Sequence, residues 1–178
     1  PVLSRVKNSI NIGTISRLDP EKNPIHLLKL ARLMINKNPK YYFYILGDGR
    51  LKEKIKRFIH KYKLTKNIIL LKNKNNIYDY LHFFDLFILT SSFEGTPNVV
   101  LESQMVGTPI VYKNAGGTAE ALIKNYSGYE LSGNSIYDDL KIINKLVLKK
   151  NFFIKRNIKI IKSKLKKFLP CNSVRRLI

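Results

Sequence analysis

The sequence predicts an α/β fold, in which a parallel sheet is covered by helices on both faces. Short β-branched or aromatic runs alternate along the chain with longer segments whose apolar residues have helical spacing. The chain has 178 residues, which suits one domain around one core. Because ligands of such sheets bind at the carboxyl ends of the strands, we expect a site in the turns that follow them.

Three strand–helix units are predicted in the first half of the chain. Residues 10–15 are a β-branched run, and Pro24 is well placed to start the helix that follows. The aromatic run 41–47 is continuously apolar, as a buried parallel strand should be. The next helix has its apolar side chains on one stripe. The predicted strands are 10–15, 41–47 and 67–71, and the predicted helices are 24–38, 51–62 and 77–84.

The second half continues the alternation with shorter elements. A strand precedes a loop and a helix that Thr96 caps and Pro97 starts. In the last predicted helix, lysines stand between apolar residues that follow the helical period. The predicted strands are 86–90, 109–112 and 126–131, and the further helices are 114–123, 136–149 and 152–169.

The net charge of +21 is the strongest compositional signal, and it is uneven. No acidic residue follows Asp139, whereas 13 Lys and Arg residues lie from Lys141 onward. This basic tail, about residues 135–178, would suit contact with an anionic membrane. A coding bias toward Lys, Asn and Ile explains the same composition without any partner. We expect no nucleic-acid partner, because no zinc-finger, RNP-type or helix-turn-helix signal accompanies the charge.

The expected location is cytoplasmic, with peripheral contact at the inner face of the membrane. The single cysteine, Cys171, excludes an internal disulfide framework and agrees with a reducing compartment. No apolar run approaches the roughly 20 residues that span a membrane, and no signal segment opens the chain. The first residue is Pro and not Met, which suggests a piece of a longer protein.

The loop and helix start near residue 97 form the first candidate site. The N–H groups of Asn98 and Val99 would have no intrahelical partner, and the helix dipole favours an anion there. A diphosphate is a natural occupant. Glu94 could reach past the phosphates to a hydroxyl-rich group, although it could instead only complement the helix dipole.

Glu102 is the second carboxylate of this stretch, and its neighbours are apolar. It stands five residues after Pro97, about 7.5 Å along the helix axis. A carboxylate in such a setting is costly unless it is paired or hydrogen-bonded. Two adjacent hydroxyls, as on a ribose, would satisfy it, whereas the plain alternative is a surface residue without a ligand.

Five motifs along the chain resemble those of GT-B glycosyltransferases of the family 4 type. FEGTPNVVLESQMVGTPIV resembles their E-x7-E signature, and IGTISRLDPEKNP resembles their Gly-x-x-x-Arg-Leu…Glu-Lys turn. YILGDGRLKEKI resembles their Gly-Asp-Gly turn. FDLFILTSSFEGTPN resembles their Ala-Asp strand with Phe84 in place of Ala, and NAGGTAEAL their Gly-Gly-x-x-Glu segment. The matches are collinear from about Asn11 to Leu122.

The resemblance implies that 1–178 is a Rossmann-like nucleotide-sugar-binding domain, the C-terminal half of a GT-B fold. It implies three catalytic residues: Arg17 and Lys22 at the donor diphosphate, and Glu94 at the sugar hydroxyls. A UDP-sugar is favoured over a GDP-sugar, transfer is expected to be retaining, and no cofactor or bound metal is expected. The donor-binding residues that it implies are Gly13, Gly47, Gly49, Arg50, Lys72, Asn73, Lys74, Thr96, Pro97, Asn98, Val99 and Glu102.

Elementary chemistry supports the two catalytic cations. Cleavage of a sugar–phosphate bond leaves a diphosphate with extra negative charge, and fixed cations such as Arg17 and Lys22 would stabilise it. The histidines, His26, His60 and His82, fall in predicted helices without clustered metal-ligand partners, so we expect them to be structural or exposed.

The sequence therefore predicts the donor half of a glycosyltransferase for polysaccharide or glycolipid assembly, with a saccharide or lipid-linked acceptor. The N-terminal acceptor half of such an enzyme is not in this sequence. Two alternatives stay open at this point. The domain could bind a nucleotide sugar without transferring it, or it could be a polyanion-binding α/β domain.

Overall fold

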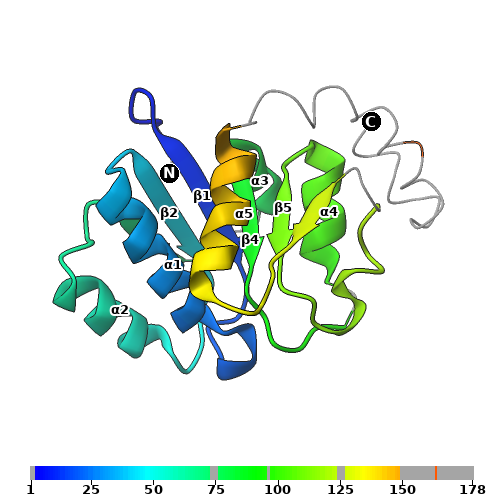
Figure 1. The fold of residues 1–178 in the computed structure, drawn as a ribbon, viewed down its shortest axis with the longest axis horizontal. Coiled ribbons are helices and arrows are strands. Elements are labelled where there is room, and N and C mark those ends of the chain that lie inside the picture. The colour runs from blue at the N-terminus through cyan, green and yellow to red at the C-terminus, as the bar shows by residue number, and fades with distance from the viewer. Residues whose placement is uncertain (1–2, 73–75, 96, 124–126, 149–162, 164–178) are drawn as a thin grey trace.

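The structure, a computed structural model, describes residues 3–72, 76–95, 97–123, 127–148 and 163. It contains one six-stranded sheet with the strand order β3-β2-β1-β4-β5-β6, and all five neighbouring pairs are parallel (Figure 1). The strands are β1 Ile10–Ile15, β2 Tyr41–Leu46, β3 Ile68–Leu71, β4 Leu86–Leu89, β5 Ile110–Tyr112 and β6 Gly128–Glu130. The expected parallel α/β fold is confirmed.

Helices cover both faces of the sheet, as the alternating sequence pattern predicts. The helices α1, α2 and α5 pack on one face, and α3 and α4 pack on the other (Figure 1). The side chains of strand β4 alternate between the two faces. Leu86 and Ile88 pack on the face that α1, α2 and α5 cover, and Phe87 and Leu89 pack on the face that α3 and α4 cover. The helices are α1 Pro24–Lys37, α2 Lys52–Lys61, α3 Ile77–Phe83, α4 Asn98–Val106 and α5 Ile136–Leu148, with short 3-10 turns η1 Pro20–Lys22 and η2 Gly116–Thr118.

The Phe84 ring packs directly against Gly13 on the face of the sheet that α3 and α4 cover. A Cβ atom on Gly13 would lie 2.1 Å from Cε2 of Phe84, so the ring occupies the space that any side chain at Gly13 would need. Phe84, which is 4% exposed, can therefore replace the smaller alanine of the family pattern. Packing explains this glycine, which lies within β1 rather than in the turn after it.

Two sequence predictions are corrected at helix ends. Helix α4 begins at Asn98 with Pro97 at the N-cap position, and no side chain caps it. Pro97 therefore stands one residue before the first helical turn, and the expected cap, Thr96, lies outside the described residues. The segment 114–123 forms only a three-residue 3-10 turn, because the pair Gly116–Gly117 disfavours a helix and Gly116 has φ of 59°.

The C-terminal part is described up to Leu148. Helix α5 confirms the prediction for 136–149, whereas the predicted helix 152–169 and most of the basic tail lie outside the described residues. Within the described residues, every helix is too short or too polar to cross a bilayer.

Candidate functional site

The strand order reverses between β1 and β4, which are neighbours in the sheet. The chain moves from β1 to β2 on one side and from β4 to β5 on the other, so the segments that follow β1 and β4 diverge at their carboxyl ends. Open α/β sheets bind ligands at such a point. The segment after β1 contains Arg17 and η1, and the segment after β4 contains Glu94.

Lys22 and Glu94 meet across this point. Lys22 Nζ lies 2.6 Å from Glu94 Oε2, although the two residues are 72 positions apart in the chain. The other carboxylate oxygen, Oε1, accepts a hydrogen bond of 2.5 Å from the Ser91 hydroxyl. The side chains are 15% and 9% exposed, so this ion pair is largely shielded from water. Two of the residues predicted to be catalytic therefore touch each other.

Further hydrogen bonds near this pair join the segment after β1 to the segment after β4. The Thr90 hydroxyl lies within hydrogen-bond distance of the carbonyl oxygens of Lys22, at 3.2 Å, and Asn23, at 3.0 Å. The Ser92 N–H donates to the carbonyl of Glu21 at 2.8 Å. Neither the hydroxyl of Ser91 nor that of Thr90 was singled out from the sequence; the Ser-rich loop in the motif was the only signal for them.

The Gly-Gly turn supports Glu94 from a third segment. The N–H of Gly117 donates to the Glu94 carbonyl at 3.2 Å. A Cβ atom on Gly116 would lie 2.1 Å from the same carbonyl oxygen, so only glycine allows this approach. The NAGGT stretch thus has a role in placing the Glu94 backbone.

Arg17 and Arg50 form a second group of cations, bridged by two carboxylates. Arg17 lies 3.3 Å from Asp19 and 2.9 Å from Glu21, and Arg50 lies 3.3 Å and 3.6 Å from the same two residues. The Arg50 backbone N–H also donates to Asp19, and this bond is the main reason that the pKa of Asp19 lies below its ordinary value. Sequence reasoning did not identify Asp19 or Glu21, although both lie inside the RLDPEK motif.

The turn after β2 is packed against the turn after β1, which brings Arg50 to Arg17. The N–H of Leu18 donates to the Asp48 carbonyl, and the N–H of Leu51 donates to the Leu18 carbonyl, both at 2.8 Å. A Cβ atom on Gly47 would lie 1.9 Å from the Ser16 carbonyl oxygen. The predicted glycines Gly47 and Gly49 therefore serve the close approach of two backbones. A direct contact between these glycines and a ligand stays a prediction.

Glu102 lies on α4, half-buried, and burial raises the pKa of its carboxyl group. Burial also raises the pKa of Tyr78 on α3, and the charge of Glu102 adds to that shift, so the two side chains are near each other. Among the described residues Glu102 has no hydrogen-bond or ion-pair partner. A carboxylate in this state can accept hydrogen bonds from the hydroxyl groups of a ligand.

The remaining predicted residues are placed unevenly. Asn98 and Val99 form the first turn of α4, where N–H groups lack intrahelical acceptors. Lys72 follows β3 and is exposed, whereas Asn73 and Lys74 lie outside the described residues. The expected base contact of this segment stays a prediction.

The histidines have structural or exposed positions. His26 Nε2 lies 3.0 Å from Asp139, a residue that is 1% exposed, and this contact joins α1 to α5. His60 and His82 are exposed. In the part of the chain that the structure describes, no three His, Cys, Asp or Glu side chains gather as metal ligands would.

A family model described as glycosyl transferases group 1 matches residues 2–166. The chain is 34% identical over 139 residues to the UDP-Gal:alpha-D-GlcNAc-diphosphoundecaprenol alpha-1,3-galactosyltransferase of Escherichia coli, covering 76% of this chain and 36% of that protein. It is 32% identical over 133 residues to the Vi polysaccharide biosynthesis protein VipC/TviE of Salmonella typhi, covering 75% and 22%. The chain thus spans well under half of these relatives.

Solved structures have the same fold. A crystal structure of a Staphylococcus aureus TarM mutant with fondaparinux, alpha-GlcNAc-glycerol and UDP has a TM-score of 0.80 at 25% identity, covering 95% of this chain and 35% of that one. The C-terminal domain of a glycosyl transferase group 1 family protein, LpcC of Francisella tularensis, has a TM-score of 0.74 at 19% identity. There the match covers 87% of this chain and 85% of the other, so the two folds are similar in extent.

Proposed function

The chain belongs to the glycosyl transferases group 1 family, and from this premise we propose that it binds the nucleotide-sugar donor of a glycosyltransferase. The reaction transfers the sugar from a nucleoside diphosphate to an acceptor hydroxyl, with retention of the anomeric configuration. The observation that carries the proposal is the Lys22–Glu94 pair at the point where the strand order reverses. It joins a cation suited to a diphosphate with a carboxylate suited to sugar hydroxyls.

The cations would stabilise the leaving group. As the sugar–phosphate bond breaks, negative charge grows on the diphosphate, and Lys22 and Arg17 provide fixed positive charge for it. The N–H groups of Asn98 and Val99 at the start of α4 would bind phosphoryl oxygens. Because these groups supply the charge that a metal ion would otherwise supply, we propose that transfer requires no bound metal.

Two carboxylates would recognise the donor at different places. Glu94 is held by Lys22 and Ser91 but keeps further lone pairs, which would accept hydrogen bonds from the sugar hydroxyls. Glu102 is half-buried, and burial raises the pKa of its carboxyl group. Its carboxylate would accept hydrogen bonds from both ribose hydroxyls. This would place the donor along the start of α4, with its diphosphate between the two glutamates.

We propose a UDP-sugar rather than a GDP-sugar as the donor. The relative from Escherichia coli is named for transfer from UDP-Gal, and the similar TarM structure contains UDP. The acceptor is proposed to be a saccharide or a lipid-linked saccharide, since the same relative acts on a diphosphoundecaprenol-linked sugar.

A second domain would complete the active site by binding the acceptor. The relatives are about three to five times longer than the matched region, which leaves room for such a half. Phe93, the residue before Glu94, is 71% exposed, which suits contact with a further protein surface or with the acceptor. We expect no transfer by these 178 residues alone.

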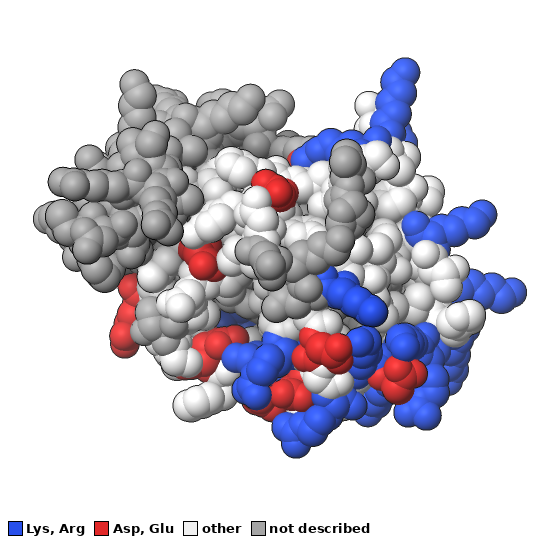
Figure 2. All heavy atoms as spheres, turned by 180° about the vertical axis from the view of Figure 1, so that it is seen from behind, with Lys and Arg blue, Asp and Glu red and all other residues white. Residues whose placement is uncertain are grey.

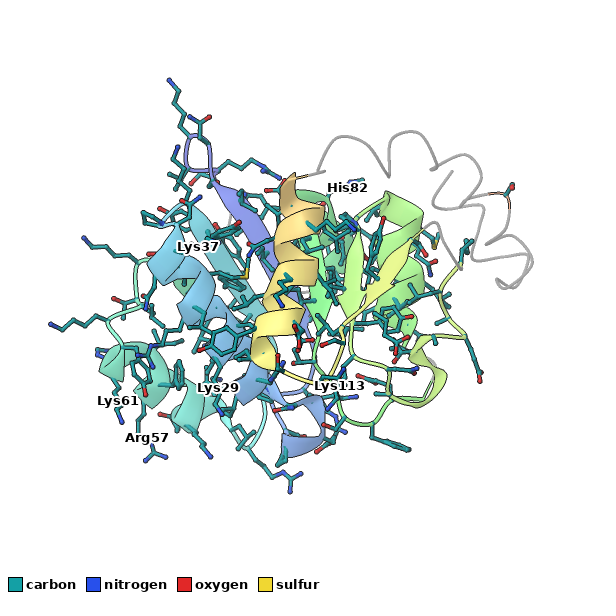
Figure 3. All side chains as sticks on the ribbon, viewed as in Figure 1. Lys29, Lys37, Arg57, Lys61, His82 and Lys113 are labelled. Carbon is teal, nitrogen blue, oxygen red and sulfur yellow. The ribbon has the colours of Figure 1, made fainter. Side chains whose placement is uncertain are left out.

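We also propose a cytoplasmic location with peripheral attachment to the inner face of the membrane. Exposed cations project from one flank of the molecule, where Lys29 and Lys37 of α1 and Arg57 and Lys61 of α2 point outward (Figure 3). Figure 2 shows basic side chains projecting along an edge, while basic and acidic side chains interleave at the lower end. A lipid-linked acceptor would be reached from such an attached state.

Calorimetric titration of the chain with UDP, GDP and their sugar conjugates tests the donor assignment. Saturable binding of UDP, weakened by Glu102→Ala, is expected. Transfer is then assayed with the acceptor half present, with and without EDTA. Binding without transfer would indicate a binding module, and salt-sensitive affinity for nucleic acid without affinity for UDP would indicate a polyanion-binding domain.

A further inference from the structure

Asp19 lies between the two arginines and is more deeply buried than either. Its side chain is 10% exposed, whereas the side chains of Arg17 and Arg50 are 70% and 74% exposed. Asp19 Oδ1 accepts from the backbone N–H of Arg50 at 3.0 Å and from its Nε at 3.3 Å. Asp19 Oδ2 lies 3.3 Å from Arg17 Nη1. One carboxylate thus holds two guanidinium groups from two different turns.

The turn around Asp19 is built for this contact. A Cβ atom on Gly49 would lie 2.8 Å from Asp19 Oδ1 and 2.7 Å from the backbone of Leu18. Glycine at this position lets the backbone of the β2 turn approach the carboxylate closely enough to donate to it. The backbone bond and the glycine together fix where the Asp19 charge sits.

Two exposed arginines would not stay side by side without such a group. Their like charges repel, and each side chain has several rotatable bonds that favour spreading into solvent. A guanidinium has five N–H groups, so contact with Asp19 leaves several of them free for phosphoryl oxygens. An ionised carboxylate behind the pair both neutralises the repulsion and aims the free N–H groups outward.

We propose that Asp19 is the positioning residue of the diphosphate site, holding Arg17 and Arg50 as a preformed pair for the donor. The inference rests on the proposed function, because it takes the ligand of the two arginines to be a nucleoside diphosphate. Asp19 acts through the arginines and does not touch the donor.

Glu21 contacts the same two arginines in a different manner. It lies 2.9 Å from Arg17 and 3.6 Å from Arg50, and its side chain is 33% exposed. Its carboxylate accepts no backbone N–H among the described residues, whereas Asp19 does. Glu21 is therefore the partner that a diphosphate replaces, and Asp19 is the partner that stays.

The competing explanation is that Asp19 only ties two turns together. Asp19→Asn separates the two roles, because its amide oxygen can still accept from the Arg50 N–H while the charge is gone. A merely structural role predicts little change in UDP affinity once that hydrogen bond is kept. A positioning role predicts a loss of affinity that depends on the arginines.

The experiment is a titration of UDP into wild type, Asp19→Asn, Asp19→Glu and Glu21→Gln, with the thermal unfolding midpoint of each. We expect Asp19→Asn to weaken UDP binding about tenfold, the scale of one charge-assisted hydrogen bond, at a midpoint close to that of wild type. Asp19→Glu, which restores the charge, should recover part of the affinity. Glu21→Gln should bind UDP at least as tightly as wild type.

A double-mutant cycle gives the decisive outcome. In an Arg17→Ala/Arg50→Ala background, Asp19→Asn should cause no further loss of affinity, because the groups through which it acts are gone. An equal loss in both backgrounds, or unchanged affinity in the single variant, would overturn this inference alone. Failure of wild type to bind either UDP or GDP would overturn the proposed function and this inference with it.

Discussion

Lys22 and Glu94 form a largely buried ion pair that joins the segments after β1 and β4 at the carboxyl edge of the sheet. The pair has an N–O distance of 2.6 Å, and its side chains are 15% and 9% exposed. Each partner neutralises a charge that would otherwise stand in a poorly hydrated place. A residue predicted to be catalytic therefore also maintains the shape of the loop that carries the other.

Lys22→Ala is expected to reduce both stability and turnover. Loss of one partner leaves Glu94 uncompensated, and we expect roughly 3 kcal/mol of destabilisation, the lower end for buried pairs, because this site opens to water. In the complete transferase kcat should fall more than donor affinity, since the Lys22 charge matters most as the diphosphate departs. Denaturant unfolding and steady-state kinetics measure the two effects.

Lys52→Ala is the matched control. Lys52 pairs with Asp48 at 2.6 Å, but the Asp48 side chain is 72% exposed, and exposed pairs contribute little, so this variant should unfold close to wild type. Arg17→Ala should reduce kcat in the way that Lys22→Ala does, with little loss of stability. A raised KM with unchanged kcat in the Lys22 and Arg17 variants would instead assign both residues to ground-state binding.

Gly13→Ala should destabilise the fold by roughly 1–3 kcal/mol, because the added methyl group meets the Phe84 ring at 2.1 Å. Phe84→Ala alone should cost roughly 3–5 kcal/mol through the cavity that it leaves. The double variant should be more stable than the sum of the two predicts, since the methyl group enters the vacated space. Urea unfolding of all three variants gives the coupling energy.

Gly95→Ala serves as the control for this cycle, because a Cβ atom there has no heavy atom within 4 Å. Its free energy of unfolding should stay within about 0.5 kcal/mol of wild type. Strict additivity of the Gly13 and Phe84 substitutions would mean that the ring moves aside and that the glycine is not required by packing.

Periodicity and turn chemistry were sufficient for the order of the elements. The apolar run of β2 and the stripe of α2 predicted buried elements because burial demands apolar side chains at fixed spacing. The helix predicted for 114–123 was wrong, because the Gly116–Gly117 pair disfavours a helix and the close approach of Gly116 to the Glu94 carbonyl shapes this turn. Such a contact between distant segments leaves no local period in the sequence.

The site shows the same division. Arg17, Lys22, Glu94 and Glu102 were found because their residue types and spacing carry a motif. Asp19 was not found, although it lies two residues from Arg17, because its role depends on the turn that brings Arg50 across. From the sequence alone, Asp19 would be interpreted as an ordinary surface charge, because the sequence does not show that the turn with Arg50 packs against it.

Because of Glu102, stability should increase and UDP affinity should decrease as pH falls. Burial raises its folded pKa above the ordinary 4.5, so the folded state binds more protons than the unfolded state in the window above 4.5. Its contribution to the free energy of unfolding therefore increases as pH falls through the pKa of the folded state. The contribution is fully present below the pKa of the unfolded state. UDP affinity should fall over the same window, because the protonated group accepts fewer ribose hydrogen bonds.

Glu102→Gln is the control for this titration. The variant should lose the pH dependence of both quantities in that window, measured by urea unfolding and by calorimetry at several pH values. A wild-type protein whose UDP affinity stays level across the window would show that Glu102 does not bind the ribose as a carboxylate.

Glu94→Ala and Glu102→Ala should leave different parts of the function intact. Glu102→Ala should weaken both UDP and the intact UDP-sugar by roughly 1–3 kcal/mol, the range for losing a charged hydrogen-bond partner. Glu94→Ala should hardly change UDP affinity, because the sugar that it contacts is absent from UDP, but it should impair transfer and discrimination among sugars. Calorimetry with UDP and with the UDP-sugar measures these effects, and an equal loss of UDP affinity in both variants would show that the two carboxylates are assigned wrongly.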